Sequence, residues 1–232
     1  VQRRCGRFER TAKAGLQTVL PQVGRRLAVT GKGGTSMLST LGATMLVQII
    51  VMMGVAAVPV LAPLLATQLS LPRDFAGAYQ SIAFFGAALM TVVAGTLVRR
   101  YGGIRVNQVA CALCAVGVAL PILGITTVLI LGAVVAGAAY GMATPGASHV
   151  LARVTTSQTR GIVFSVKQSA VTFGGLLAGL SLPALAELYN WQTALVGLAV
   201  AAVVAIVIVQ PIRIKLDDDR DPTQPITFTS VT

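Results

Sequence analysis

The fold of this chain is decided by an uncharged run at residues 106–152, which reads VNQVACALCAVGVALPILGITTVLILGAVVAGAAYGMATPGASHVLA. The run contains no Asp, Glu, Lys or Arg over 47 residues. A helix needs about 20 apolar residues to cross the hydrocarbon core of a bilayer, which is about 30 Å thick. One crossing cannot use so long a run, whereas two crossings joined by a short turn near residues 121–126 fit it. We therefore predict two transmembrane helices here.

The same test, applied outward from this run, finds four more crossings. Two uncharged stretches precede it, the first of them containing Pro59 and Pro63, and two follow it, with Lys167 as the one interruption. The predicted spans are 41–69, 75–98, 106–122, 127–152, 161–186 and 188–212. The sequence therefore predicts an all-α transmembrane fold, a six-helix bundle. A basic tail at 1–40 precedes the bundle, and a polar linker at 213–232 follows it.

Composition and charge placement support a membrane protein. Hydrophobic residues make up 55% of the chain and charged residues 11%, whereas a soluble domain has about 25% charged residues. The net charge of +11 could suggest a nucleic-acid partner. However, the basic residues flank the apolar runs, so the lipid bilayer is the expected partner and no nucleic acid is expected.

The positions of the basic residues predict the orientation. With the N-terminus inside, 16 of the 18 Lys and Arg residues fall in cytoplasmic segments, where such residues are retained. We expect a multi-pass protein of the cell inner membrane with a cytoplasmic N-terminus. Two interpretations of the first 36 residues stay open: a translated basic tail, or sequence upstream of a true start at Met37.

The loop between the second and third predicted spans carries a recognisable motif, GTLVRRYGGIR at residues 95–105. It resembles the signature loop of the major facilitator superfamily, Gly-x-Leu-Ala-Asp-Arg-x-Gly-Arg-Arg. The cytoplasmic gating loop that this implies comprises Gly95, Arg99, Arg100, Gly102 and Arg105. Arg99 stands where the family usually has Asp, so the contact of that Asp is not carried over. An ordinary basic loop with turn glycines is the alternative interpretation.

A second likeness to the superfamily lies between Tyr140 and Trp191, and the resemblance as a whole covers residues 41–212. It includes YGMATPG at 140–146, FSVKQ at 164–168 and FGGLLAG at 173–179. The resemblance implies the N-terminal half of the fold, two inverted three-helix repeats, with a C-terminal six-helix half expected as partner. It implies a secondary active transporter of a small solute that works by alternating access. The alternative is a self-contained six-helix channel or membrane assembly subunit that acts as an oligomer.

Polar residues within the spans are candidates for the substrate pathway. Lys167 is the most informative because an ionisable group within a span is costly and commonly marks a pathway. It would attract an organic anion if it faced a cavity, whereas its long side chain could instead reach the membrane interface. The predicted pathway residues are Gln48, Tyr79, Gln80, Lys167, Gln168 and Thr172.

Other residues are assigned to packing. Gly137 and Gly141, and Gly175 and Gly179, repeat at four residues and so share a helix face, which lets membrane helices approach closely. The motif at Cys111 and Cys114 is interpreted as packing, and the single histidine, His149, has no ligand partner in the sequence. We therefore expect neither an enzyme nor a metal or other cofactor.

The predicted orientation can be tested with reporter fusions to the full-length protein. A reporter that is active only in the cytoplasm should be active when fused after Arg100 and inactive when fused after Asp74, because only the first position lies in a basic, cytoplasmic loop. The reverse pattern of activities would contradict the prediction.

Overall fold

The computed structural model describes residues 37–72 and 74–216, so the tail before Met37, Arg73 and the linker from residue 217 lie outside the described residues. Helices account for nearly all of the described chain. They are α2 (Met37–Leu69), α3 (Phe75–Tyr101), α4 (Gly103–Ala119) with the short 3-10 helix η1 (Leu120–Leu123), α5 (Thr126–Val154), α6 (Arg160–Leu188) and α7 (Trp191–Leu216). Six of them are long and apolar enough to cross a membrane, which confirms the six predicted spans.

The helices run past the boundaries predicted from charge. α2 begins at Met37, about one helical turn before the first residue of the predicted span 41–69. α3 continues through Arg99 and Arg100 because basic side chains in a last turn interact favourably with the negative end of the helix dipole. The predicted seven-residue loop is therefore reduced to Gly102, whose φ of 94° suits glycine.

The predicted turn near residues 121–126 is present in a compact form. η1 ends at Gly124, which has a φ of 69°, and the Gly124 N–H donates to the carbonyl oxygen of Pro121 at 3.0 Å. This turn reverses the chain between α4 and α5.

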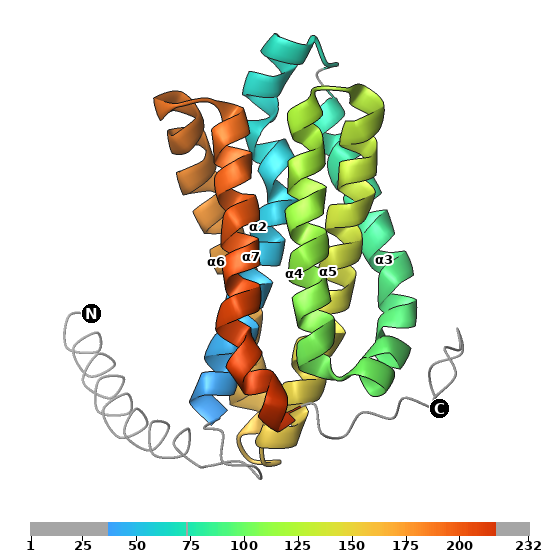
Figure 1. The fold of residues 1–232 in the computed structure, drawn as a ribbon, viewed down its shortest axis with the longest axis vertical. Helices are drawn as coiled ribbons and strands as arrows, with labels where there is room; N and C mark the ends of the chain where they lie inside the picture. The colour runs from blue at the N-terminus through green and yellow to red at the C-terminus, as the bar shows by residue number, and fades with distance from the viewer. Residues whose placement is uncertain (1–36, 73, 217–232) are drawn as a thin grey trace, which may run out of the picture.

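The packing of the helices follows an internal two-fold pattern. The most extensive contact joins α3 to α5, and it is followed by the contacts of α4 with α5, of α2 with α6 and of α4 with α7. The first three helices, α2, α3 and α4, correspond in order to the last three, α5, α6 and α7. Under this correspondence the α3–α5 contact is equivalent to the α6–α2 contact. Because successive helices cross the bundle in opposite directions (Figure 1), the two three-helix units are inverted relative to each other. This confirms the predicted bundle of inverted repeats.

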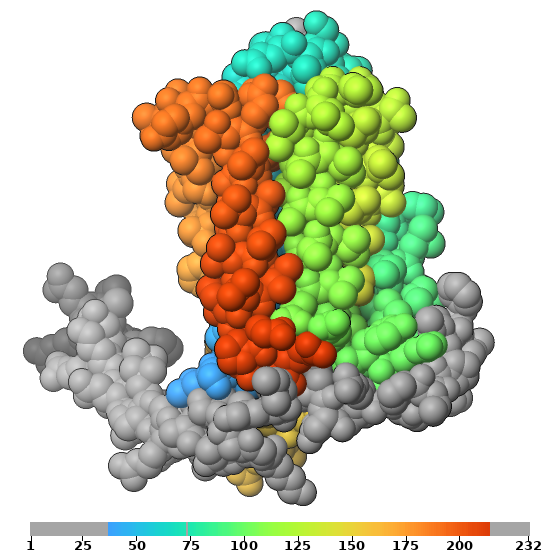
Figure 2. Space-filling view, in the orientation of Figure 1, coloured from blue at the N-terminus to red at the C-terminus, as the bar shows by residue number. Residues whose placement is uncertain are grey.

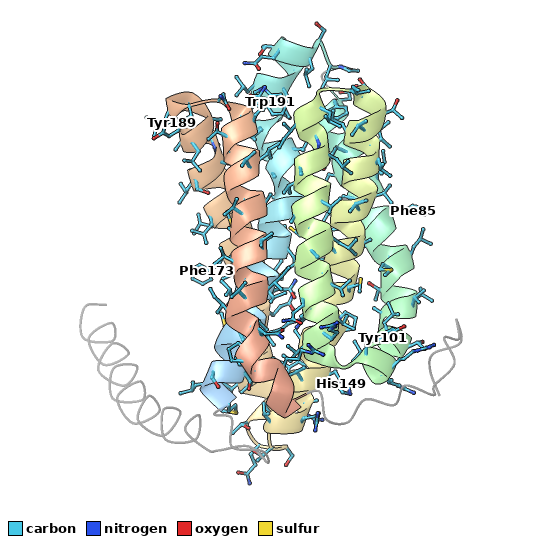
Figure 3. The ribbon with its side chains drawn as sticks, viewed as in Figure 1. Phe85, Tyr101, His149, Phe173, Tyr189 and Trp191 are labelled. Carbon is cyan, nitrogen blue, oxygen red and sulfur yellow. The ribbon has the colours of Figure 1, made fainter. Side chains whose placement is uncertain are left out.

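We name the two ends of the bundle by their residues. The basic end contains the helix ends that carry Arg99, Arg105, Arg153, Arg160 and Arg213. The far end contains the connections 70–74, 120–125 and 189–190. Figure 3 shows His149 and Tyr101 toward the basic end and Tyr189 and Trp191 at the far end. The basic end is the one predicted to face the cytoplasm.

One face of the bundle is formed by α4 and α7, which lie side by side in Figure 2. A groove of about 500 Å³ between them is lined entirely by alanine, valine and isoleucine side chains, among them Ala115, Val116 and Val200. Large apolar side chains are also exposed on α3, α5 and α6. Such an apolar surface matches hydrocarbon rather than water.

Glycines permit the closest helix contact, between α3 and α5. A Cβ added at Gly137 would collide with the carbonyl oxygen of Ala83, and one added at Gly141 would collide with that of Ala87. On α3, a Cβ at Gly86 would lie 2.9 Å from the carbonyl oxygen of Val134. Both helices thus meet backbone to backbone, where lipid gives apolar side chains no drive to associate.

We predict that Gly137→Ala lowers the free energy of unfolding by about 1–3 kcal/mol, because the new methyl group must push the α3 backbone away. Thermal unfolding of the detergent-solubilised protein would measure this. Gly197→Ala on α7 is the matched control, since a Cβ there meets nothing within 4 Å, and it should leave stability unchanged or slightly higher. Equal effects of the two substitutions would contradict the packing role of Gly137.

Candidate substrate pathway

The predicted pathway residues fall into two groups. Gln48, Tyr79 and Lys167 are inside the six-helix bundle, with 0%, 1% and 2% of their surface exposed. Gln168 and Thr172 are exposed, and Gln80 is half-buried. A pathway that runs between this bundle and a second one would be lined by residues that are exposed in the single bundle. The structure therefore does not bring the six predicted residues together into one site.

The exposed polar residues belong to a continuous stripe on α6. Its members share a spacing of three or four residues, which places them on one helix face. We call this face the α6 stripe; it consists of Gly161, Ser165, Gln168, Thr172, Gly175 and Gly179. A Cβ added at any of its three glycines meets nothing within 4 Å, so no described helix covers the stripe.

A different exposed face of α6 carries large apolar side chains. Ile162, Val166, Phe173 and Leu180 are between 39% and 65% exposed, and Figure 3 shows Phe173 at the outer edge of the bundle. These residues suit contact with lipid. α6 therefore presents two distinct exposed faces, one apolar and bulky, the other small and polar.

Within the bundle, the contact face of α6 differs by one residue from the predicted face. We expected Gly175 and Gly179 to pack against another helix, but a Cβ added at either one meets no neighbouring atom. Gly174 makes that contact, because its Cβ would lie 2.7 Å from the carbonyl oxygen of Ile49 on α2. Ala170 and Ala178, four residues to either side, are fully buried with it.

Lys167 points into the bundle on the side of this α2 contact. It precedes Gly174 by seven residues, which is two helical turns and hence the same face. The described acidic residues are Asp74 and Glu187, both near the far end. Glu187 lies 20 residues further along α6, or about 30 Å at 1.5 Å per residue. Neither described carboxylate can therefore neutralise the Lys167 ammonium group.

The residues of the predicted gating loop lie at the ends of two helices. Gly95 is within α3, where an added Cβ would meet nothing within 4 Å, and Arg99 and Arg100 lie in the last turn of α3. The Arg100 guanidinium lies 5.5 Å from the ring centre of its neighbour Tyr101. Arg105 is in the first turn of α4.

Sequence reasoning missed the glycine that closes this end of the bundle. A Cβ added at Gly103 would lie 2.8 Å from the carbonyl oxygen of Gly146 and 2.5 Å from Val150. A Cβ at Gly146 would in turn lie 2.5 Å from Oδ1 of Asn107. The second glycine of the Gly-Gly pair, as well as the matched motif glycine Gly102, is therefore required by the geometry.

A proline in α5 is compensated across the helix interface. Pro145 has no N–H and so leaves the carbonyl oxygen of Gly141, four residues earlier, without its helical donor. The Thr91 hydroxyl of α3 lies 3.2 Å from that oxygen and 2.8 Å from the carbonyl oxygen of Ala87. Thr91 thus supplies a donor to α5 where α5 lacks its own.

Two further polar contacts join helices that are distant in sequence. The Trp191 indole N–H at the start of α7 donates to Oε1 of Gln68 on α2 at 2.6 Å. Gln108 on α4 donates through Nε2 to Oε1 of Gln210 at 2.5 Å and to the carbonyl oxygen of Ile206 at 3.2 Å, both on α7. α7 is thus tied to α2 at the far end and to α4 toward the basic end.

Comparison with known proteins identifies the class to which this architecture belongs. The family model described as Major Facilitator Superfamily matches residues 44–229. The chain therefore belongs to the major facilitator superfamily, a family of membrane transporters, and is a multi-pass membrane protein. This confirms the family that the motifs predicted.

A solved structure shows the same fold. The structure titled "In meso crystal structure of the POT family transporter PepTSo" aligns with a TM-score of 0.59 and 17% sequence identity, over 79% of this chain and 40% of that chain. This chain thus spans about two fifths of the length of that transporter. A search of the curated proteins finds no match.

We predict that Thr91→Val lowers the melting temperature by about 2–4 °C, as expected for the loss of about 1 kcal/mol from one hydrogen bond. In a Pro145→Ala background the same substitution should cost less, because residue 145 then has an N–H for Gly141. The control is Thr67→Val, since the Thr67 hydroxyl bonds only within α2, to Leu64. An equal cost of Thr91→Val in both backgrounds would contradict the compensation.

Proposed function

We propose that this chain is one six-helix half of a secondary active transporter that carries a small solute, an organic anion, by alternating access. The second half would be another six-helix bundle. The single observation that carries this proposal is the α6 stripe, a polar and small-residue face left open on a bundle that otherwise exposes bulky apolar side chains. Membership of the superfamily and the coverage of 40% of a solved transporter support it.

The composition of the α6 stripe suits protein and solute rather than lipid. Glycines allow a second bundle to approach the helix closely. Gln168 and Thr172 lie one turn apart on the same face, and their side chains offer neutral donors and acceptors for hydrogen bonds. A stripe of this kind can hold a second bundle at its glycines and contact a polar solute between them.

The charge near the stripe favours an anion. Lys167 directly precedes Gln168, and no described carboxylate can neutralise it. Its charge lies in a medium of low dielectric, where the electrostatic potential of a cation that no described carboxylate neutralises extends further than in water. We therefore propose that Lys167 attracts the anion without touching it, while Gln168 and Thr172 make direct contact.

Uptake of a panel of radiolabelled organic anions by cells that express the full-length gene would test the proposal. Gln168→Ala and Thr172→Val should each reduce uptake at low substrate concentration about tenfold, the effect of losing about 1.4 kcal/mol of binding. Phe173→Leu on the apolar face of α6 is the matched control and should transport normally. Normal uptake by both stripe variants would remove the stripe from the pathway.

The charge of the substrate is tested separately. Lys167→Met keeps the length of the side chain and removes its charge, so it should reduce uptake of anions more than uptake of any neutral solute that is transported. Equal effects on both classes would leave the transporter proposal standing and reject the anion.

The partner that covers the stripe can be identified by cross-linking. A cysteine introduced at Ser165 should form a cross-link with the second bundle of the same full-length chain. A cross-link between two copies of the chain would favour the alternative, an oligomeric channel or assembly subunit.

A further inference from the structure

Buried polar side chains are confined to one part of the bundle. In the described core they are Thr40, Thr44, Gln48, Thr96, Asn107, Gln108, Thr159 and Lys167. Each of them lies toward the basic end. Thr159 directly precedes α6, and each of the others is at most 11 residues from the end of its helix on that side. Toward the far end, the polar groups of the described core are the Tyr79 hydroxyl and the Trp191 indole N–H, and the latter is bonded to Gln68.

Two of these side chains have no hydrogen-bond partner among the residues that the structure describes. Both amide atoms of Gln48 and both amide atoms of Asn107 are unpaired, although the two residues are completely buried. Their neighbours differ in this respect. The Thr44 hydroxyl donates to backbone carbonyl oxygens of its own helix at 2.9 and 3.0 Å, and Gln108 bonds to α7.

The register of the helices places Gln48 and Asn107 at the same depth. α2 and α4 both run from the basic end to the far end, and Cys114 Sγ lies 3.6 Å from the carbonyl oxygen of Ile50 and against Gly54. Two turns before Cys114 is Asn107, and two turns before Gly54 is Val47. Asn107 therefore lies at about the level of Val47, the residue before Gln48, and its Oδ1 lies close to Gly146 of α5.

Lys167 belongs to nearly the same level. α6 runs parallel to α2, and Gly174 meets Ile49 and Met52. Two turns earlier on both helices, Lys167 lies level with residues 42–45. Side chains of a helix tilt toward its N-terminus, so the Gln48 amide and the Lys167 ammonium group both extend toward the basic end. We call these three side chains, Gln48, Asn107 and Lys167, the polar layer.

An unpaired amide is costly inside a membrane protein, and so is a buried ammonium group that no described carboxylate neutralises, since lipid offers neither of them a partner. Water is the ligand that suits all three groups, since an internal water bonds to about three polar atoms and can both donate and accept. We propose that the polar layer is an internal water site, filled from the basic end, in which Gln48 and Asn107 hold ordered water and Lys167 is solvated. The apolar core beyond it closes the site toward the far end.

This site shares Lys167 with the proposed function, in which the charge of Lys167 attracts the anion, but its two amides, Gln48 and Asn107, are buried inside one bundle whereas the α6 stripe is exposed. The proposal also differs from an ordinary dry core in a measurable way. In a dry core, replacing an unpaired polar group by an apolar group of similar shape raises stability, whereas at a water site it removes hydrogen bonds and lowers stability.

The test measures melting temperatures of the full-length protein in detergent for Gln48→Leu, Asn107→Leu and Lys167→Met. We expect each to melt about 2–4 °C below the wild type. A melting temperature equal to or above that of the wild type for Gln48→Leu and Asn107→Leu would overturn the proposal.

Two matched variants calibrate this measurement. Gln108→Leu removes an amide that is bonded within the protein, so it should lower the melting temperature under either hypothesis. Tyr79→Phe removes an unpaired hydroxyl outside the polar layer, so it should leave the melting temperature unchanged or raise it.

A direct observation covers the case in which the leucine variants do not fold. A structure of the wild-type full-length protein, at a resolution that shows water, should contain ordered density within hydrogen-bonding distance of the Asn107 or Gln48 amide. Amides that contact only carbon atoms of the protein would overturn the proposal.

Discussion

The constraint on which the structure depends is that a bilayer offers no hydrogen-bond partner to the backbone. Every crossing must therefore be a helix that satisfies its own N–H and C=O groups, and any break must be repaired from a neighbour. Pro145 shows this requirement at a single atom. It leaves the carbonyl oxygen of Gly141 without a helical donor, and the Thr91 hydroxyl of α3 lies within hydrogen-bonding distance of that oxygen. The connections between helices are accordingly brief, and that between α3 and α4 is Gly102 alone.

The same solvent also removes the usual reason for helices to associate. Hydrocarbon accepts apolar side chains as well as a protein core does, so association must come from close contact and from polar groups. The structure uses both. Gly137 and Gly141 bring α5 onto the backbone of α3, while Gln108 and Trp191 fasten α7 through amide and indole hydrogen bonds.

The sequence predicted the number of helices and the family because both depend on properties that are local in the chain. Uncharged intervals define the crossings, and the residue types of the loop after α3 define the family. Helix ends were predicted less well because charge was taken as a boundary, although Arg99 and Arg100 are stable in a last turn. Within the bundle, the close contact of α6 is made by Gly174 with Ala170 and Ala178, one residue away from the predicted pair Gly175 and Gly179. The packing role of that pair stays a prediction.

The division of the predicted pathway residues could not be predicted, since it depends on which neighbour lies opposite each face. Lys167 and Gln168 are adjacent in sequence, yet one is buried and the other exposed because successive residues of a helix are turned by about 100°. This adjacency has a physical consequence for the proposed function. A buried charge one residue from an exposed amide can influence a solute on the α6 stripe electrostatically, while its own solvation is supplied from inside the bundle. α6 would then carry the charge on one face and the contacts with the solute on another.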